Sequence, residues 1–367
     1  MRYLSEFRSP ELVESLLKKI KHTVTRDWNI MEVCGGQTHS LVKNGILNML
    51  PSNIEMIHGP GCPVCVTPVS LIDKAVHLAM EHNVVLCSYG DMIRVPGSGI
   101  SLLEAKAKGA DVRILYSPLE AVTIAKENPD KEVVFFAVGF ETTAPANALS
   151  VINAKRAGLQ NYSILASHVL VPPAIEGIMD DELSNVDAFL GAGHVCAIMG
   201  IHEYYPLVEK YKVPIVITGF EPVDLLEGIY MVVKQLEAGK AKLENQYARV
   251  VKEEGNIKAQ ETIYEVFDVT DRLWRGMTVI PMSGYKVKDA YSDFDADKKF
   301  AIDIAEPLEN SGCIAGEIMK GIKKPFNCQH FGKRCKPTTP LGAPMVSNEG
   351  ACAAYYHYAG LAKGVEI

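Results

Sequence analysis

The chain has 367 residues, more than one hydrophobic core usually holds, so two or three domains are expected. Hydrophobic residues make up 48% and charged residues 22%, an average globular usage that excludes a disordered or collagen-like chain. The 37 Lys and Arg against 44 Asp and Glu give a formal charge of −7, which argues against a nucleic-acid-binding protein with a basic face. The longest apolar runs, such as residues 133–140, are shorter than a membrane span, and the first eight residues lack the apolar core of a signal peptide. We therefore expect a cytoplasmic protein that binds neither nucleic acid nor a membrane.

The first predicted element is a helix that begins at Pro10. Ser9 suits the cap, Pro10 the first helical position, and Glu11 the positive end of the helix dipole. Short apolar runs then alternate with helical patterns, and several runs lack polar alternation, which is typical of parallel strands covered on both faces. The expected strands are residues 29–33, 53–58, 83–88, 111–116, 132–138, 162–166, 186–190 and 213–218. This alternation predicts an α/β fold of parallel sheets doubly wound with helices.

Two segments of the chain resemble each other. Residues 135–141 (FFAVGFE) and 215–221 (IVITGFE) each combine an apolar strand, a Gly-Phe-Glu turn and a proline-bearing helix start. The repeat favours two similar α/β lobes, although one sheet reusing the same turn is the alternative. We place the boundary near residues 128–130 and expect a first lobe at 1–128, a second at 129–245 and a smaller iron–sulfur domain at 246–367. Whether residues 1–45 pack with the first lobe or with the C-terminal domain stays open.

The pattern changes after residue 239. Residues 240–258 are charged and predicted to be helical, and residues 264–280 alternate in a way that suits a small antiparallel element. Residues 312–350 are rich in Gly, Pro and Cys and have little periodicity. Irregular chain of that length inside a compact domain needs something other than a core to order it, and a metal centre would do so.

Four of the nine cysteines lie near the end of the chain, and an odd total in a chain without a visible export signal does not suggest a disulfide framework. These four, at positions 313, 328, 335 and 352, lack the paired C-x2-C knuckles of most structural zinc sites. Four thiolates in such a setting suit a cubane iron–sulfur cluster, whose negative charge nearby cations would offset. The surrounding basic residues are Lys320, Lys323, Lys324, Lys333, Arg334 and Lys336. A zinc site and four unconnected thiols remain the alternatives.

A second cysteine motif, HGPGCPVC at residues 58–65, follows an apolar strand. The sulfurs of Cys62 and Cys65 can reach one another at this spacing, and a helix N-terminus would lower the pKa of the first thiol. Such a pair can cycle between dithiol and disulfide or can hold a metal. Two thiols packed in a turn are the alternative.

The third motif, CGGQTH, begins at Cys34. A cysteine at a strand end followed by two glycines places sulfur beside free backbone N–H groups, which stabilise a thiolate or an anionic ligand on a bound metal. His39 is a candidate second ligand or proton donor, with a capping or core role as the alternative. Glu141 and His194 follow strands, where open α/β sheets form their crevices, and are further candidates, with a turn role as the alternative.

Several nucleotide and radical motifs are absent from the sequence. It contains no G-x-x-x-x-G-K-[ST] phosphate loop and no complete G-x-G-x-x-G. It also lacks a C-x3-C-x2-C triplet. Nucleotide-driven and radical chemistry are therefore unsupported.

Taken together, these motifs resemble the HypD family of hydrogenase maturation factors. The matching pieces are residues 34–39, 59–65, 139–145 and the cysteine-rich end up to Cys352, and their occurrence in this order is highly specific. The resemblance implies a scaffold on which the Fe(CN)2CO unit of [NiFe]-hydrogenase is assembled. It also implies complexes with the small chaperone HypC and with HypE, which delivers cyanide.

The resemblance further implies roles for individual cysteines. Cys34 would hold the iron near the HypC contact, and Cys62 and Cys65 would form a redox-active pair. The ligands of a [4Fe–4S] cluster would be Cys313, Cys328, Cys335 and Cys352. We hypothesise that electrons pass from this cluster to Cys62 and Cys65 and then to the iron at Cys34, in a redox-active assembly scaffold rather than a turnover enzyme. The alternatives are a stand-alone, cluster-dependent thiol–disulfide reductase and a zinc-stabilised α/β interaction protein.

Overall fold

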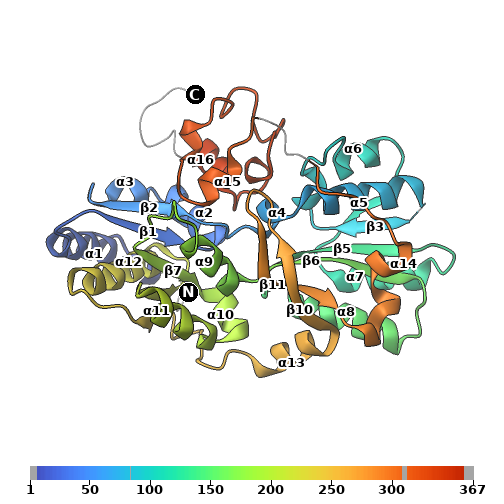
Figure 1. The fold of residues 1–367 in the computed structure, drawn as a ribbon, viewed down its shortest axis with the longest axis horizontal. Helices are drawn as coiled ribbons and strands as arrows, with labels where there is room; N and C mark the ends of the chain where they lie inside the picture. Colours follow the sequence, from blue (N-terminus) through green and yellow to red (C-terminus); the bar gives the residue numbers. More distant parts are fainter. Residues whose placement is uncertain (1–5, 83, 308–311, 359–367) are drawn as a thin grey trace.

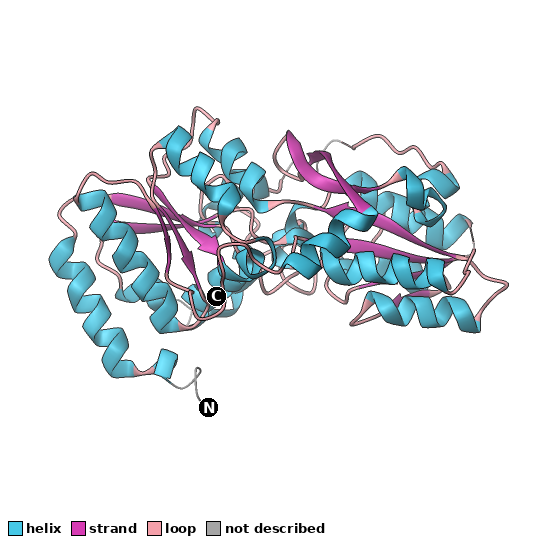
Figure 2. Ribbon diagram, turned by 90° about the horizontal axis from the view of Figure 1, so that it is seen from below, coloured by secondary structure: helices cyan, strands magenta, loops and turns pink. Residues whose placement is uncertain are grey.

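The computed structural model describes residues 6–82, 84–307 and 312–358. It contains two parallel β-sheets, and Figure 2 shows helices packed along the strands of both lobes. The predicted α/β fold class is confirmed. Within the described ranges, no helix combines the length and apolar character that a membrane crossing needs.

Five parallel strands form the larger sheet, on the left of Figure 1. Their spatial order is β2 (Ile54–His58), β1 (Trp28–Glu32), β7 (Ala188–Ala192), β8 (Ile215–Thr218) and β9 (Leu243–Asn245). The helices of this lobe are α1 (Pro10–Thr23), α2 (Gly35–Lys43), α3 (Ile46–Met49), α9 (Val171–Met179), α10 (Gly193–Met199), α11 (Tyr205–Tyr211) and α12 (Pro222–Glu237). Consecutive residues of β1 enter different cores, because Ile30 packs with α1 and α12 whereas Met31 packs with α9 and α11. The predicted cap of α1 is confirmed, since Leu12 N donates to Ser9 Oγ.

Four parallel strands form the second sheet, on the right of Figure 1. Their order is β4 (Val112–Ile114), β3 (Val85–Ser88), β5 (Val133–Gly139) and β6 (Tyr162–His168). Its helices are α5 (Val69–Glu81), α6 (Leu102–Ala107), α7 (Pro118–Glu127) and α8 (Ala144–Arg156). Phe135 and Phe136 of β5 are fully buried in the cores on opposite faces, as expected for a strand covered on both sides. All eight strands expected from the apolar runs are therefore confirmed.

The predicted lobe boundary near residue 128 is wrong. It falls between β4 and β5, which belong to the same sheet. The chain instead builds β1 and β2, crosses to form the whole four-stranded sheet, and returns to complete the first sheet with β7, β8 and β9. The return is fixed by parallel pairing of β7 with β1, which sets Ala188 opposite Ile30. The repeated Gly-Phe-Glu turns thus lie one in each sheet, after β5 and after β8.

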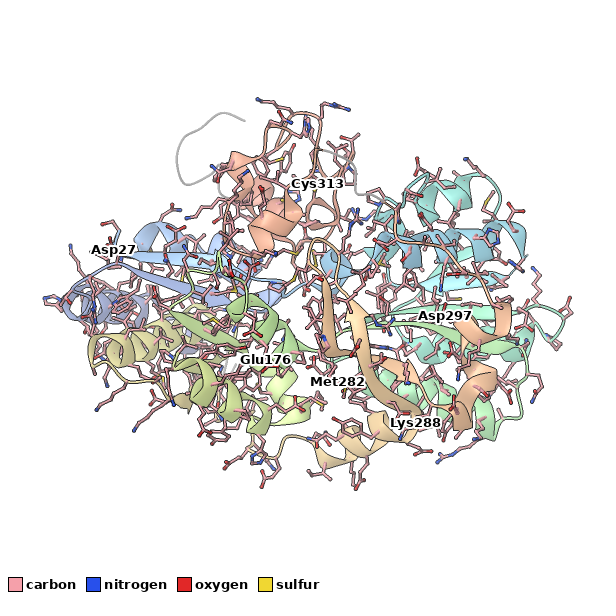
Figure 3. The ribbon with its side chains drawn as sticks, viewed as in Figure 1. Asp27, Glu176, Met282, Lys288, Asp297 and Cys313 are labelled. Atoms are coloured by element: carbon pink, nitrogen blue, oxygen red, sulfur yellow. A yellow bond between two sulfur atoms is a disulfide. The ribbon has the colours of Figure 1, made fainter. Side chains whose placement is uncertain are left out.

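An antiparallel hairpin, β10 (Phe267–Leu273) and β11 (Val279–Val287), lies between the lobes and confirms the predicted small antiparallel element. It follows α13 (Ile257–Val266) and precedes α14 (Ala296–Phe300), whose Asp297 pairs with Lys74 at 2.6 Å. Figure 3 labels Met282 on this hairpin and Asp297 in the four-stranded lobe. Residues 257–300 therefore pack with the lobes rather than in a separate C-terminal domain. The helix predicted at 240–258 is wrong, because Gly239 and Gly255 adopt positive φ and the edge strand β9 and turns lie between them.

The cysteine-rich segment, residues 312–358, sits above the junction of the lobes in Figure 1. Its helices are α15 (Ala315–Met319) and α16 (Ala351–Tyr358), and one-turn α4 (Pro63–Val66) lies at the junction beneath it. The remaining short 3-10 helices are Glu6–Arg8, Met92–Arg94, His202–Tyr204, Asp289–Phe294, Pro325–Asn327 and Ala343–Met345. Helix α16 packs against α2. Of residues 1–45, the described part therefore belongs to the five-stranded lobe and also meets the C-terminal segment through α2.

Candidate functional site

Cys34 lies where β1 ends and α2 begins. It is 3% exposed and occupies the N-cap position of α2 with extended backbone angles. Its N–H donates to Glu32 Oε2 at 2.9 Å, and the hydroxyl of Thr38 donates to the same carboxylate. The strand-to-helix turn predicted from the CGG sequence is therefore present, with a buried carboxylate beneath it.

The loop of the second motif packs directly against Cys34. Gly35 N donates to Gly61 O at 2.8 Å, and Gly59 N donates to Glu32 O at 2.9 Å. A Cβ atom at Gly61 would lie 2.2 Å from Cys34 N, so only glycine permits this approach of the two backbones. The two motifs, at residues 34–39 and 58–65, thus form one unit at the ends of neighbouring strands.

Cys62 and Cys65 form a disulfide with a Cα–Cα distance of 5.2 Å. Both are almost fully buried, and Cys62 caps the short helix α4. They share one apolar cluster with Cys34 and Phe140. The three cysteines expected to converge are therefore close neighbours.

His194, at the start of α10, is the titratable side chain that meets the Cys34 sulfur. Its Nε2 lies 3.6 Å from Cys34 Sγ. Burial lowers the pKa of His194 to about 4, so its imidazole is neutral at pH 7. Burial, together with the carboxylates of Glu349 and Glu32, raises the pKa of Cys34 well above its usual value. At neutral pH the site therefore holds a protonated thiol beside a neutral imidazole.

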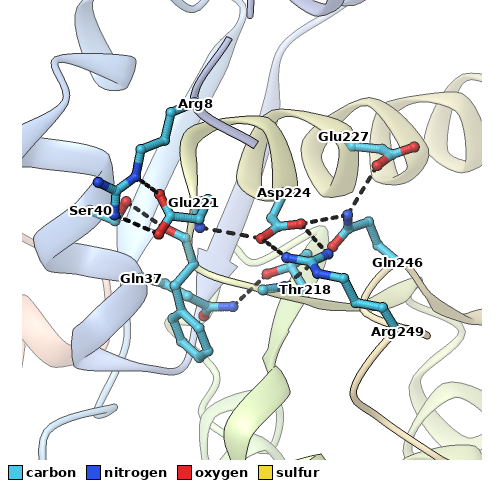
Figure 4. A network of polar contacts seen from close by, with 11 residues as sticks. Arg8, Gln37, Ser40, Thr218, Glu221, Asp224, Glu227, Gln246 and Arg249 are labelled. Atoms are coloured by element: carbon cyan, nitrogen blue, oxygen red, sulfur yellow. Dashed lines mark hydrogen bonds and ion pairs between the residues drawn. The ribbon is translucent and has the colours of Figure 1, made fainter. Parts of the chain in front are cut away.

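A polar network at the end of β8 holds the ring on which His194 rests. The ring of Phe220 stacks on His194 at 4.8 Å between centroids, and Ser40 Oγ donates to Phe220 O at 2.6 Å. One turn further on, the fully buried carboxylate of Asp224 accepts two hydrogen bonds from Arg249 at 2.6 and 2.7 Å (Figure 4). A bidentate pair of this kind fixes the start of α12 and with it the Gly-Phe-Glu turn.

His39 contacts the cysteine-rich segment. Its Nδ1 lies 3.2 Å from Asn348 O, and its ring contacts the ring of Tyr358 edge-on. These contacts join α2 to the cysteine-rich segment. The structure therefore gives His39 a docking contact, and the ligand or proton-donor role considered from the sequence stays a prediction.

Glu141 lies in the turn after β5 and is 1% exposed. Its Oε1 accepts a hydrogen bond from Val171 N at 2.9 Å, and its buried Oε2 has no partner within the described chain. Burial raises the pKa of Glu141 to about 8, so it is protonated at neutral pH. This carboxyl group connects the turn after β5 to the start of α9, and no hydrogen bond among the described residues joins it to Cys34.

A cleft of about 610 Å³ opens between the lobes beside this site. It is lined by the CPVC loop, by the carboxyl ends of β3 and β5, by His194 and by the turn before α16, including Glu349. Parallel strands of two sheets thus point their carboxyl ends at one space, where α/β proteins bind ligands. The thiol, the disulfide and the cleft together form the candidate site.

The four C-terminal cysteines gather around a second, small cavity of about 20 Å³. Cys335 Sγ accepts a hydrogen bond from Leu341 N at 3.4 Å, a backbone contact of the kind that surrounds cluster sulfurs. Burial raises the pKa of Cys352, and the charges of the other three cysteines raise it further, as close thiolates do. Figure 3 labels Cys313 within this segment. The sequence-predicted ligand set therefore meets at one place.

The donor set around this cavity consists of four thiols. Thiolates are soft ligands that suit zinc or an iron–sulfur cluster. Among the described residues, no three His, Cys, Asp or Glu side chains are arranged so that they could hold a metal ion. The chemistry of the four donors therefore fits the predicted cluster and leaves the zinc alternative open.

The range matched in comparisons with known proteins includes both groups of cysteines. A family profile, HypD, described as "Hydrogenase formation hypA family", matches residues 11–359. The chain belongs to the HypD family. Proteins named "Hydrogenase maturation factor HypD" are 45% identical in Azotobacter vinelandii, 45% in Rhodobacter capsulatus and 44% in Escherichia coli K12. The alignments cover 98% of this chain and 97%, 99% and 98% of those relatives.

In this HypD family member, three of the basic residues near the C-terminal cysteines serve a different purpose from the one predicted. Lys320 pairs with Asp181 at 2.8 Å, and Lys324 pairs with Glu55 at 3.1 Å. Lys323 pairs with Glu317 at 2.8 Å. Two of these pairs fasten the segment to the five-stranded lobe, so these cations are not free to offset the charge of a cluster.

Several residues of this site were given no role in the sequence analysis. Glu32, His58, Phe220 and Glu349 all lie within the Cys34 unit or beside it. An acid inside the apolar run before Cys34 was the available signal for Glu32, because buried acids are rare without partners. His58 begins the HGPGCPVC motif, whereas Phe220 and Glu349 are brought to Cys34 by tertiary packing.

Proposed function

We propose that this chain is a [NiFe]-hydrogenase maturation factor that holds iron while cyanide and carbonyl ligands are attached. The observation that carries the proposal is the direct contact of the Cys34 turn with the Cys62–Cys65 loop beside an open cleft. The family relationship and the names of the relatives support the same pathway.

Cys34 is the proposed anchor for the iron of the Fe(CN)2CO cargo. Iron(II) that carries cyanide and carbon monoxide is soft and electron-rich, and a thiolate is a suitable ligand for it. Binding requires loss of the Cys34 proton, since metal ligation deprotonates a thiol. The imidazole of His194 lies 3.6 Å from Sγ and is the polar group beside the sulfur that gives up this proton.

The Cys62–Cys65 pair is the proposed electron donor for cyanide transfer. Cleavage of a carrier thiocyanate, R–S–CN, takes up two electrons and one proton and gives R–SH and cyanide, which bonds to the iron. Oxidation of the dithiol to the disulfide releases two electrons and two protons. One proton goes to the carrier sulfur and the other leaves the site, so the step balances for each cyanide.

Cys313, Cys328, Cys335 and Cys352 are the proposed ligands of a [4Fe–4S] cluster. When bound, the cluster supplies single electrons, and two electrons with two protons are what the disulfide requires to become a dithiol again. The segment that carries these cysteines also contributes Glu349 to the cleft, next to Gly35. The two centres therefore share an interface in the fold.

The proposed partners are HypC and HypE, working with this chain in the cytoplasm. The cleft beside Cys34 is large enough to admit a segment of a partner chain, and Tyr116 at its mouth is 92% exposed. A cyanide carrier needs such access because the sulfur of Cys34 is itself buried.

The test is anaerobic co-expression with HypC and HypE, with infrared detection of cyanide and carbonyl bands on protein-bound iron. We expect Cys34→Ala and Cys62→Ala to abolish the bands. Cys87→Ala is the matched control, because Cys87 is equally buried but lies in the core of the four-stranded sheet. A Cys62→Ala protein that assembles cyanide-ligated iron at the normal rate would contradict the proposed electron donor.

The second candidate, a stand-alone thiol–disulfide reductase, has the Cys62–Cys65 disulfide in its favour. Against it, the two cysteines are only 4% and 2% exposed, so a protein disulfide cannot reach them without an opening of the loop. Turnover of a model disulfide in the absence of HypC and HypE, together with failure to form a complex with HypC, would favour the reductase.

A further inference from the structure

A buried hydrogen-bonded chain joins the Cys34 turn to the helix that carries Cys352. It starts at the Cys34 N–H, which donates to Glu32 Oε2 at 2.9 Å. The other oxygen of Glu32 lies 2.8 Å from His58 Nδ1. His58 Nε2 in turn lies 3.0 Å from the hydroxyl of Tyr355 on α16.

The hydrogen bonds of this series depend on one another. Burial raises the pKa of Tyr355, so its hydroxyl remains protonated. When this hydroxyl donates to His58 Nε2, His58 carries its ring proton on Nδ1 and donates it to Glu32. Glu32 is 0% exposed and both His58 and Tyr355 are 5% exposed, so water does not replace these partners. Each member of the chain is held by the next.

The Tyr355 end of this series of hydrogen bonds lies on the helix that carries Cys352. Cys352 and Tyr355 are three residues apart on α16, which places them on the same side of the helix. The ring of Tyr355 also packs edge-on against Phe326 of the same segment. Whatever fixes the sulfur of Cys352 therefore fixes the position of the Tyr355 hydroxyl.

We propose that His58 and Tyr355 are positioning residues through which occupancy of the cysteine-rich centre sets the reactivity of Cys34. Binding at the four cysteines holds α16, which keeps Tyr355 on His58 and the Glu32 carboxylate under the Cys34 N–H. When nothing is bound at the four cysteines, Tyr355 is no longer held against His58, and the hydrogen bonds that support the Cys34 turn become weaker. The inference rests on the proposed function, since it takes Cys352 as a cluster ligand. The coupling is reciprocal, so iron at Cys34 also favours the occupied centre.

The experiment measures alkylation of Cys34 by iodoacetamide in the full-length protein, with peptide mass spectrometry to resolve each cysteine. The protein is compared cluster-free and after reconstitution with ferrous iron and sulfide, with iron and sulfide content determined for both. We expect Cys34 of the wild type to react about fivefold more slowly when the centre is filled, the effect of one hydrogen bond gained. The ratio of the two rates is the readout of coupling.

Tyr355→Phe removes the hydroxyl alone and should bring this ratio to about one. Tyr356→Phe is the matched control, because Tyr356 lies on the same helix but contacts Phe331 and His357 instead of His58. It should keep the wild-type ratio. A residue with a merely structural role would change both rates together and leave the ratio unaltered.

His58→Asn tests the chain from the other side. Asparagine keeps a donor near the position of Nδ1 but cannot reach Tyr355, so the ratio should again fall to about one. Combining His58→Asn with Tyr355→Phe should cause no further change, since both break the same connection. If Tyr355→Phe fails to hold iron, His58→Asn decides, because it alters no residue of the cysteine-rich segment.

Two results would overturn the inference. One is a wild-type ratio of one in protein whose iron and sulfide content shows a filled centre. The other is a wild-type ratio that survives in both Tyr355→Phe and His58→Asn. Absence of bound iron and sulfide from the reconstituted wild type would instead overturn the proposed function on which the inference rests.

Discussion

Cys34, Cys62 and Cys65 follow two neighbouring strands of one sheet, whereas Cys313, Cys328, Cys335 and Cys352 are spread along a segment with little regular structure. The first group is fixed by backbone hydrogen bonds, by glycines in direct contact and by a shared apolar cluster. The second group surrounds a small cavity and is fastened to the lobes by ion pairs and by α16. The first centre is therefore shaped by the polypeptide itself, and we propose that the second depends on what its cysteines bind.

This difference suits the chemistry proposed for each centre. A site that receives and releases a cargo benefits from a geometry that does not depend on the cargo being present. A centre that only transfers electrons can be part of the fold, so its assembly can contribute folding free energy to the segment around it. The predictions below test that contrast, from the largest expected effect to the smallest.

Removal of the metal centre should affect the two regions very differently. After chelation of iron, or in Cys328→Ala, we expect amide hydrogen exchange between Cys313 and Leu341 to accelerate about a hundredfold or more, because local opening no longer has to break metal–sulfur bonds. Exchange in β1, β5 and β8 should change little. Cys196→Ala, which alters a buried cysteine of the five-stranded lobe, is the control and should leave the segment protected. Equal hydrogen-exchange rates of this segment in iron-free and iron-loaded protein would show that its structure does not depend on bound metal.

The contact between Gly61 and Cys34 should be the most sensitive point of the first centre. In Gly61→Ala the added methyl group would lie 2.2 Å from Cys34 N, where backbone must move to admit it. We expect a loss of about 3 kcal/mol in the free energy of unfolding, as for severe overpacking, measured by urea denaturation. Gly99→Ala is the matched control, since nothing lies within 4 Å of a Cβ at Gly99. A midpoint shift as small as that of Gly99→Ala would show that this loop is not packed as described.

The same contrast explains how far the sequence could predict the molecule. Apolar runs identified eight strands because each is buried on both faces. The strands of both sheets have the same apolar pattern, so the sequence of a strand does not indicate to which sheet it belongs. The assignment of β1 to the sheet of β7 depends on pairing Ile30 with Ala188, which only tertiary packing decides. The cysteine motifs located both centres because thiol chemistry is readable from spacing. No role was predicted for His58, the first residue of the HGPGCPVC motif, or for Tyr355, because neither residue type at its position differs from an ordinary buried one.

Glu141 should make the stability of the protein decline as the pH rises from 4.5 to about 8. Its pKa rises from 4.5 to about 8 on folding, so the folded state keeps a proton that the unfolded state loses. The stability from this proton is complete below pH 4.5 and is lost progressively up to pH 8. Glu141→Gln cannot ionise and should exceed the wild type by about 2 kcal/mol at pH 6 and by more at pH 8.5, with little difference at pH 4.5. Glu127→Gln is the control, because Glu127 is exposed on α7, and it should show no such pH dependence. Equal urea midpoints for Glu141→Gln and the wild type at pH 8.5 would contradict the burial of Glu141.

The smallest effect is expected at Phe220, whose ring stacks on the imidazole of His194. Phe220→Leu removes a stacked contact and should cost about 1 kcal/mol of stability. Its more informative consequence concerns the pKa of His194, which burial holds at about 4. Water admitted beside the imidazole should raise this pKa toward 6.5, as measured by NMR titration of the ring protons. Phe326→Leu, in the exposed part of the cysteine-rich segment, should leave it unchanged. An unaltered pKa in Phe220→Leu would mean that His194 is buried by the strand ends alone, and the neutral imidazole beside Cys34 would then depend on the sheet rather than on the Gly-Phe-Glu turn.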